Sequence, residues 1–306
     1  MKDIYIIGNG VIAKALAVAL TLNGKKVTII RGSVDQQPVS TESIEVETEN
    51  GVLQAELKIS TLNHHDSLDG IILLATKSFG NEALAEKLRF KTNESPIVFL
   101  QNGLDVEKPF LEYGFENLYR CVLFTTSQSL TGNRVRFKPV AASPVGTISG
   151  SSSMLEYIIE EINTSIFGFR AEEDIRTVIW KKVISNCVFN SICPLLEIDN
   201  GVFYRDSSAM ALATEVVKEC LVVAKGIGVN LGLDEMLENI LLLSKMSDGQ
   251  LISTYQDILN NRETEIETLN FAVAAASKNA SLPSTLLLGK LVKMKADLHF
   301  EAAKES

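Results

Sequence analysis

The segment that most restricts the fold of this chain is Gly8-Asn9-Gly10-Val11-Ile12-Ala13. An apolar run of strand length precedes it, an Ala-rich helical pattern follows it, and a second apolar run lies at residues 27–30. In such a βαβ unit the first glycine makes the tight turn and the second lets a pyrophosphate approach the backbone. The small sixth residue lets helix and strand pack closely, and the helix N-terminus receives the negative charge. The spacing therefore predicts dinucleotide binding by Gly8, Asn9, Gly10, Val11, Ile12 and Ala13, with a purely structural βα turn as the alternative.

The two halves of the chain carry different patterns. Short apolar runs in the first half alternate with helical segments, which is typical of parallel strands buried on both faces. The second half is helical in period almost throughout. We therefore predict an α/β fold with a doubly wound Rossmann-type sheet in residues 1–170 and an all-α helical domain in residues 171–306. Predicted strands are residues 4–7, 27–30, 70–75 and 96–100, with β-type pieces in 125–149; predicted helices are 11–22, 81–88, 174–189, 208–225, 233–244, 253–259, 264–279 and 285–300.

Composition narrows the class of protein. A formal net charge of −9 over 306 residues argues against a nucleic-acid partner, because phosphate contacts need a basic face. The four dispersed cysteines are predicted to be buried free thiols in a reducing compartment, the cytoplasm. The spacing of cysteines and histidines predicts no metal site, and no apolar run is long enough for a membrane partner.

The residue after the second predicted strand bears on the choice of dinucleotide. NAD enzymes usually place an acidic residue there for the ribose 2′-hydroxyl, whereas this chain has Arg31. A guanidinium can pair with the 2′-phosphate of NADPH, and Lys77 adds a second positive charge past another strand. We therefore expect NADPH/NADP+ as cofactor, with an ordinary surface role for Arg31 as the alternative.

One predicted helix carries a polar stripe. Lys182, Asn186 and Asn190 recur every four residues among apolar neighbours. The stripe could be a solvent face, but Asn is a poor helix former, which favours a specific role. An apolar setting lowers the pKa of a lysine and makes it a better proton donor near neutral pH.

Three further residues have two interpretations from the pattern alone. Ser253 and Glu265 each lie in a sequence that fits a capping box, so each could have no role beyond the start of a helix, or could have a functional role as well. Asn102 follows a strand at the carboxyl edge of the predicted sheet, where it could shape a turn or contact a ligand.

Taken together, these segments resemble the ketopantoate reductase (2-dehydropantoate 2-reductase) family over nearly the whole chain. The motifs are Gly8-x-Gly10-x-x-Ala13, Arg31, Lys77, Gln101-Asn102-Gly103-Leu104, Trp180-Lys181-Lys182 with Asn186 and Asn190, Ser253-x-x-Gln256-Asp257 and Arg262-x-Thr264-Glu265. The resemblance implies that Lys182 protonates the ketone oxygen and that Glu265 hydrogen-bonds the developing hydroxyl. It further implies that Asn186, Asn190 and Ser253 hold a small anionic 2-oxo acid, and that Asn102 lies where nicotinamide and substrate meet.

The activity that the resemblance implies is NADPH-dependent reduction of 2-dehydropantoate to (R)-pantoate in pantothenate biosynthesis. Asp105 stands where the family commonly has glycine, Ser191 where proline is common, and residues 125–128 also depart from the usual pattern. Alternatives are therefore a related reductase of another 2-oxo acid and a non-catalytic NADP-binding sensor. Helical domains of this kind can remain monomeric or form a homodimer, and the sequence leaves both open.

Overall fold

The structure is a computed structural model that describes residues 2–32, 35–277 and 280–305. The chain divides into two compact units. The first contains Met1–Gln101 and Val106–Ile175, and the second contains Asn102–Asp105 and Arg176–Ser306. The predicted boundary at residue 170 falls within the last strand of the first unit, β11 (Phe169–Ala171).

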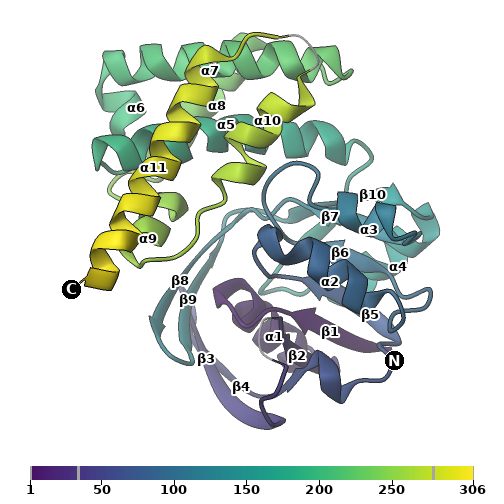
Figure 1. Ribbon diagram of the computed structural model, residues 1–306. Helices are drawn as coiled ribbons and strands as arrows, with labels where there is room; N and C mark the ends of the chain where they lie inside the picture. Colours follow the sequence, from purple (N-terminus) through teal and green to yellow (C-terminus); the bar gives the residue numbers. More distant parts are fainter. Residues whose placement is uncertain (1, 33–34, 278–279, 306) are drawn as a thin grey trace. The chain divides into compact units, whose positions relative to one another are not determined.

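Eleven strands form one sheet within the described part of the first unit, in the order β11-β10-β7-β6-β5-β1-β2-β4-β3-β9-β8. Strands β1 to β10 are labelled in Figure 1. The six neighbours from β7 to β4 are mutually parallel, and the chain winds outward from β1 in both directions. The strands are β1 (Asp3–Ile7), β2 (Val27–Arg31), β3 (Ser40–Thr48), β4 (Gly51–Thr61), β5 (Gly70–Leu74), β6 (Ile97–Phe99), β7 (Leu118–Cys121), β8 (Thr125–Thr131), β9 (Arg134–Pro139), β10 (Ser143–Ser149) and β11.

Both faces of this sheet are covered, as a doubly wound fold requires. Ile4 and Ile6 of β1 belong to an apolar core with α1 (Val11–Leu22) and α4 (Ser152–Ile162). Tyr5 and Ile7 of β1 point into a second core with α2 (Asn81–Leu88) and α3 (Lys108–Glu112). Because successive side chains of a strand alternate between faces, a continuously apolar strand fits only a sheet that is buried on both sides. The predicted fold class is confirmed.

Local signals located several elements well. Helices α1 and α2 have the predicted bounds. Helix α1 ends at Leu22, with Asn23 as its C-cap, and Gly24 follows at φ +77°, the left-handed conformation that glycine favours. The β3–β4 hairpin and helix α4 were not predicted from the sequence. Helix α4 begins at Ser152, because Ser151 caps it by accepting a hydrogen bond from the Met154 amide at 3.2 Å.

The second unit is helical, as predicted, and its helices are drawn from teal through green to yellow in Figure 1. Its elements are α5 (Ile175–Leu196), α6 (Val202–Arg205), α7 (Ser207–Gly226), α8 (Leu233–Met246), α9 (Ser253–Leu259), η3 (Ile266–Thr268), α10 (Asn270–Ala276) and α11 (Pro283–Glu305). No helix in the described ranges is long and apolar enough to cross a membrane.

Two helix predictions in this unit need correction. Helix α5 continues seven residues beyond the predicted end at Phe189 and passes through Pro194. Ile192 and Cys193 are fully buried there, and their packing favours the longer helix. The single helix predicted for 264–279 is instead η3 and α10, interrupted at Leu269, whose φ of −109° and ψ of −99° are not helical. Residues 278 and 279 of that prediction lie outside the described residues.

Candidate active site

The turn after β1 is built so that only glycine fits at its first position. Gly8 has φ +125°, and a Cβ placed on it would lie 2.8 Å from the carbonyl carbon of Ala75 and 3.0 Å from the amide nitrogen of Thr76. At Gly10, by contrast, a Cβ would meet no atom within 4 Å. Gly8 therefore allows β1 and β5 to approach closely, and Gly10 leaves open space in front of the helix.

The N-terminus of α1 faces this open space with polar groups ready for an anion. Gly10 is the N-cap of α1 and provides no side-chain cap, so the first amides of the helix, at Val11, Ile12 and Ala13, have no acceptor within the helix. The Oδ1 atom of Asn9 is buried and, among the described residues, accepts no hydrogen bond. These features fit a dinucleotide pyrophosphate at residues 8–13.

Arg31 is the last residue of β2 and lies at the carboxyl edge of the parallel strands, as the glycine turn after β1 does. Its Nη2 donates to Oε1 of Glu42 at 2.9 Å and to Oγ of Ser40 at 3.3 Å. Its Nη1 is buried and has no hydrogen-bond partner in the described part of the chain. Lys77 immediately precedes η2 (Ser78–Gly80), three residues after β5, and so lies at the carboxyl edge as well. The partner of Arg31, Glu42, was not identified from the sequence.

The two neighbouring lysines of α5 occupy different surroundings. The Lys181 ammonium pairs with Glu235 of α8 at 2.8 Å. Lys182 is one helical step further around α5 and half-buried, beside the buried residues Ile179 and Val183. Asn186 is half-buried, and Asn190 is 2% exposed. The stripe thus passes from a partly exposed lysine to a fully buried asparagine and is not a solvent face along its whole length.

Asn190 joins α5 to the start of α9. Its Oδ1 accepts hydrogen bonds from Oγ of Ser253 at 3.2 Å, from the Thr254 amide at 3.3 Å and from Oγ1 of Thr254 at 2.8 Å. The expectation that Ser253 caps its own helix is wrong, because the N-cap is Ile252 and Ser253 is the first helical residue. The cap comes instead from Asn190, which leaves the exposed Ser253 hydroxyl fixed at the helix N-terminus.

The segment after Asn102 is anchored to the turn that begins at Glu265, within the second unit. Glu265 is the half-buried N-cap residue of η3, and its carbonyl accepts from the Thr268 amide at 3.1 Å. The Thr268 carbonyl in turn accepts from the Leu104 amide at 2.9 Å. Gly103 makes this approach possible, since a Cβ there would lie 2.5–2.7 Å from Thr268 atoms at φ +100°.

The residues on either side of this segment explain its path. In the first unit, Gln101 and Asn81 exchange two side-chain hydrogen bonds of 2.8 Å, which fixes the end of β6 just before Asn102. Asp105 has φ +55°, a left-handed conformation that glycine adopts more readily. This backbone geometry fits the glycine that the resemblance described above implies at this position.

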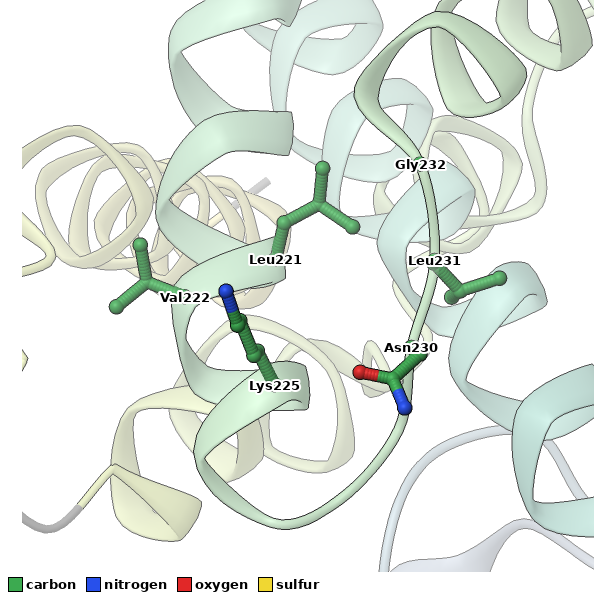
Figure 2. A pocket seen from close by; sticks show the side chains of 6 residues that line it. All are labelled: Leu221, Val222, Lys225, Asn230, Leu231 and Gly232. Carbon is green, nitrogen blue, oxygen red and sulfur yellow. The ribbon is translucent and has the colours of Figure 1, made fainter.

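A pocket of about 460 Å³ in the second unit contains none of the expected site residues. Figure 2 labels its lining: Leu221, Val222 and Lys225 on the last turns of α7, and Asn230, Leu231 and Gly232 on the segment that leads into α8. We assign no catalytic residue there. Among the described residues, no group of three His, Cys, Asp or Glu side chains could hold a metal ion, and all four cysteines are buried free thiols.

Comparisons with known proteins agree with this architecture. The family model for ketopantoate reductase PanE/ApbA matches residues 4–149, and the model for its C-terminal part matches residues 174–296. A 2-dehydropantoate 2-reductase of Pyrococcus abyssi is 25% identical over 301 residues, covering 96% of this chain and 98% of that protein.

Two solved structures show the same fold across nearly the full length. D-mandelate dehydrogenase, solved with NADH and anilino(oxo)acetate, has a TM-score of 0.85 at 20% identity. The match covers 97% of this chain and 99% of the dehydrogenase chain. A dimeric ketopantoate reductase from Staphylococcus aureus has a TM-score of 0.80 at 17% identity, with the same coverage.

The glycine turn on a doubly wound sheet, followed by a helical unit with lysine, asparagine and glutamate side chains, is the arrangement of a two-domain oxidoreductase. More specifically, the chain belongs to the ketopantoate reductase family, because the two family models together match most of its length.

Proposed function

We propose that this protein reduces 2-dehydropantoate to (R)-pantoate with NADPH. The observation that carries the proposal is the arrangement in the second unit. There Asn190 fixes Ser253 at a helix N-terminus, and the Asn102 segment is anchored to the turn that begins at Glu265. The curated relative from Pyrococcus abyssi bears the corresponding name.

The first unit would bind the cofactor. Residues 8–13 would take the pyrophosphate on the free amides of α1, with Arg31 and Lys77 supplying positive charge near the adenosine end and the carboxyl edge. The buried Asn9 Oδ1 and Arg31 Nη1, which have no partner in the described residues, support this assignment because a bound ligand would satisfy them.

The second unit would supply the acid and the substrate contacts. NADPH, when bound, supplies the hydride that adds to the C2 carbonyl carbon of the 2-oxo acid. The Lys182 ammonium gives its proton to the ketone oxygen, so that the carbonyl becomes the hydroxyl of the product. Glu265 accepts a hydrogen bond from that hydroxyl, and Ser253, Asn186 and Asn102 orient the substrate. Asn190, which is 2% exposed, acts through Ser253, whose hydroxyl it holds.

The chain provides a matched control for the acid. A positioned general acid contributes about 10²–10⁴ in rate. Lys182→Ala should therefore lower kcat by at least about 100-fold, whereas Lys181→Ala removes only the pair with Glu235 and should retain most of the activity. The assay is NADPH oxidation with 2-dehydropantoate. A loss of less than about tenfold in Lys182→Ala would exclude the general-acid role.

A second candidate is reduction of another 2-oxo acid. The structural similarity to D-mandelate dehydrogenase and the departures at Asp105, Ser191 and residues 125–128 favour testing it. A panel of 2-oxo acids with NADPH and NADH separates the two activities. Tight NADPH binding without turnover of any of them would instead indicate a non-catalytic sensor.

We also propose that the protein is a cytoplasmic homodimer. The Staphylococcus aureus ketopantoate reductase is described as dimeric, and four buried free thiols fit a reducing compartment. Light scattering of the purified chain gives the subunit number, and a mass equal to the 33.5 kDa monomer would contradict the dimer.

A further inference from the structure

The guanidinium of Arg31 is already engaged by a carboxylate. Glu42, on β3, lies eleven residues further along the chain and accepts from Nη2 at 2.9 Å. Both side chains are mostly shielded, with 15% of Arg31 and 26% of Glu42 exposed. A pair this sheltered is screened less by solvent than an ordinary surface ion pair.

Glu42 is held in place through both of its oxygens. Oε1 accepts from Arg31 and, at 3.0 Å, from Oγ of Ser40, while Oε2 accepts from Nδ2 of Asn133 at 3.1 Å. Burial alone would raise the pKa of the Glu42 carboxyl. The hydrogen bonds from Asn133 and Ser40 and the charges of Arg31 and Lys14 outweigh burial and lower that pKa, so Glu42 is an anion at neutral pH.

A second buried group fixes the far side of this cluster. Lys14, on α1, is 9% exposed and donates to the Gly132 carbonyl at 2.7 Å and to Oδ1 of Asn133 at 3.2 Å. These contacts tie the β8–β9 turn to helix α1, whose N-cap is Gly10. Asn133, and through it Glu42, is therefore positioned by α1 as well as by the sheet.

We propose that Glu42 is a specificity-determining residue that weakens the preference of this chain for NADPH over NADH. The inference rests on the proposed dinucleotide site, in which Arg31 meets the ribose 2′ position. A 2′-phosphate at Arg31 would stand beside the fixed Glu42 carboxylate and be repelled by it, whereas a 2′-hydroxyl can donate a hydrogen bond to the same carboxylate. The buried Nη1 of Arg31, which has no partner among the described residues, can donate to a phosphate oxygen.

The test measures the binding of two nucleotide fragments to the full chain by calorimetry. The fragments 2′,5′-ADP and 5′-AMP differ in the 2′-phosphate, so their dissociation constants isolate its contribution without any turnover. Glu42→Gln keeps the shape of the side chain and removes its charge. We expect it to tighten 2′,5′-ADP binding by at least about tenfold and to change 5′-AMP binding by less than about threefold.

Glu47→Gln is the matched control. It removes the same charge from the same strand, but Glu47 pairs with Arg136 at 2.7 Å and Arg134 at 3.4 Å, and both arginine side chains are about half exposed. This variant should leave both constants within about twofold. The ratio of kcat/KM for NADPH to kcat/KM for NADH should likewise rise in Glu42→Gln and stay unchanged in Glu47→Gln.

Three results would overturn the inference, and they differ from one another. An unchanged ratio of the two constants in Glu42→Gln would show that the carboxylate does not oppose the 2′-phosphate. Weaker 2′,5′-ADP binding would show that Glu42 serves to orient Arg31. Wild-type protein that binds neither fragment would contradict the proposed nucleotide site itself. If Glu42→Gln does not fold, as judged by circular dichroism, Glu42→Ser removes the charge with a smaller side chain and should give the same direction.

Discussion

The Asn190 side chain is expected to make a large contribution to the free energy of unfolding, because it caps another helix. The perturbation is Asn190→Ala, which removes the Oδ1 that accepts three hydrogen bonds at the start of α9. Loss of a helix cap costs about 1 kcal/mol. The Thr254 hydroxyl, in a residue only 2% exposed, would also lose its acceptor, and an unsatisfied buried polar group costs about 1–3 kcal/mol.

The expected decrease in the free energy of unfolding is therefore about 2–4 kcal/mol. Trp180 is the single tryptophan of the chain, is buried on α5, and so reports unfolding of the helical unit. Guanidinium titration followed by its fluorescence gives the midpoint and slope for each variant. Asn186→Ala, one turn earlier and only half-buried, should cost less than about 1 kcal/mol.

A double-mutant cycle with Thr254→Val isolates the interaction. Both single changes remove the hydrogen bond between the Thr254 hydroxyl and Asn190 Oδ1, so this loss is counted in each of them. The two effects should therefore be less than additive by about 1–2 kcal/mol. Additivity within about 0.5 kcal/mol, or a cost of Asn190→Ala below that value, would refute the reasoning from the three hydrogen bonds.

Three further predictions follow from single positions. Gly8→Ala should destabilise the first unit by more than about 3 kcal/mol, because the φ of Gly8 is +125° and the new Cβ would overlap backbone atoms. Gly10→Ala should leave thermal unfolding unchanged, because its Cβ would meet no atom, and should weaken nucleotide binding. Gly103→Ala should raise KM for the 2-oxo acid, measured by steady-state kinetics, because it would displace the segment that contains Asn102. The hydrogen bonds from Arg205 lower the pKa of Asp199 to about 2, below its ordinary value of 3.8, although burial opposes them. The stabilisation by ionised Asp199 is thus complete above the unfolded-state pKa and is lost as the pH falls towards 2. In urea titrations, wild type and Asp199→Asn should differ in free energy of unfolding by about 1–2 kcal/mol at neutral pH, and this difference should vanish as the pH falls from 3.8 towards 2. A difference that persists at the lowest pH would contradict the assignment.

The parts of the fold that the sequence predicted well depend on neighbouring residues. The βαβ unit with Gly8 and Gly10, the helix that ends before Gly24, and the buried strands all follow from hydrophobic period and turn chemistry. The β3–β4 hairpin was not predicted, although Ile44, Val46 and Leu57 alternate with charged residues as in half-buried strands. The alternation does not indicate where in the sheet these strands pair, because that depends on partners elsewhere in the chain.

In the candidate site, too, some features could be predicted from the sequence and others could not. The residue types for proton transfer and anion binding, among them Lys182 and Glu265, can be read along the chain, together with their resemblance to a family. Which groups contact one another cannot be read in this manner. Ser253 fits a capping box, yet its helix is capped by Asn190, 63 residues away. Arg31 fits a phosphate site, yet it is paired with Glu42.

The sequence by itself therefore determined the fold class, the βαβ turn and the identity of the polar side chains, because these depend on backbone propensity and periodic burial. Only the tertiary structure decided the partners of those side chains. Hydrogen bonds and ion pairs act over about 3–4 Å, and residues distant in the sequence reach that range only when the elements have packed.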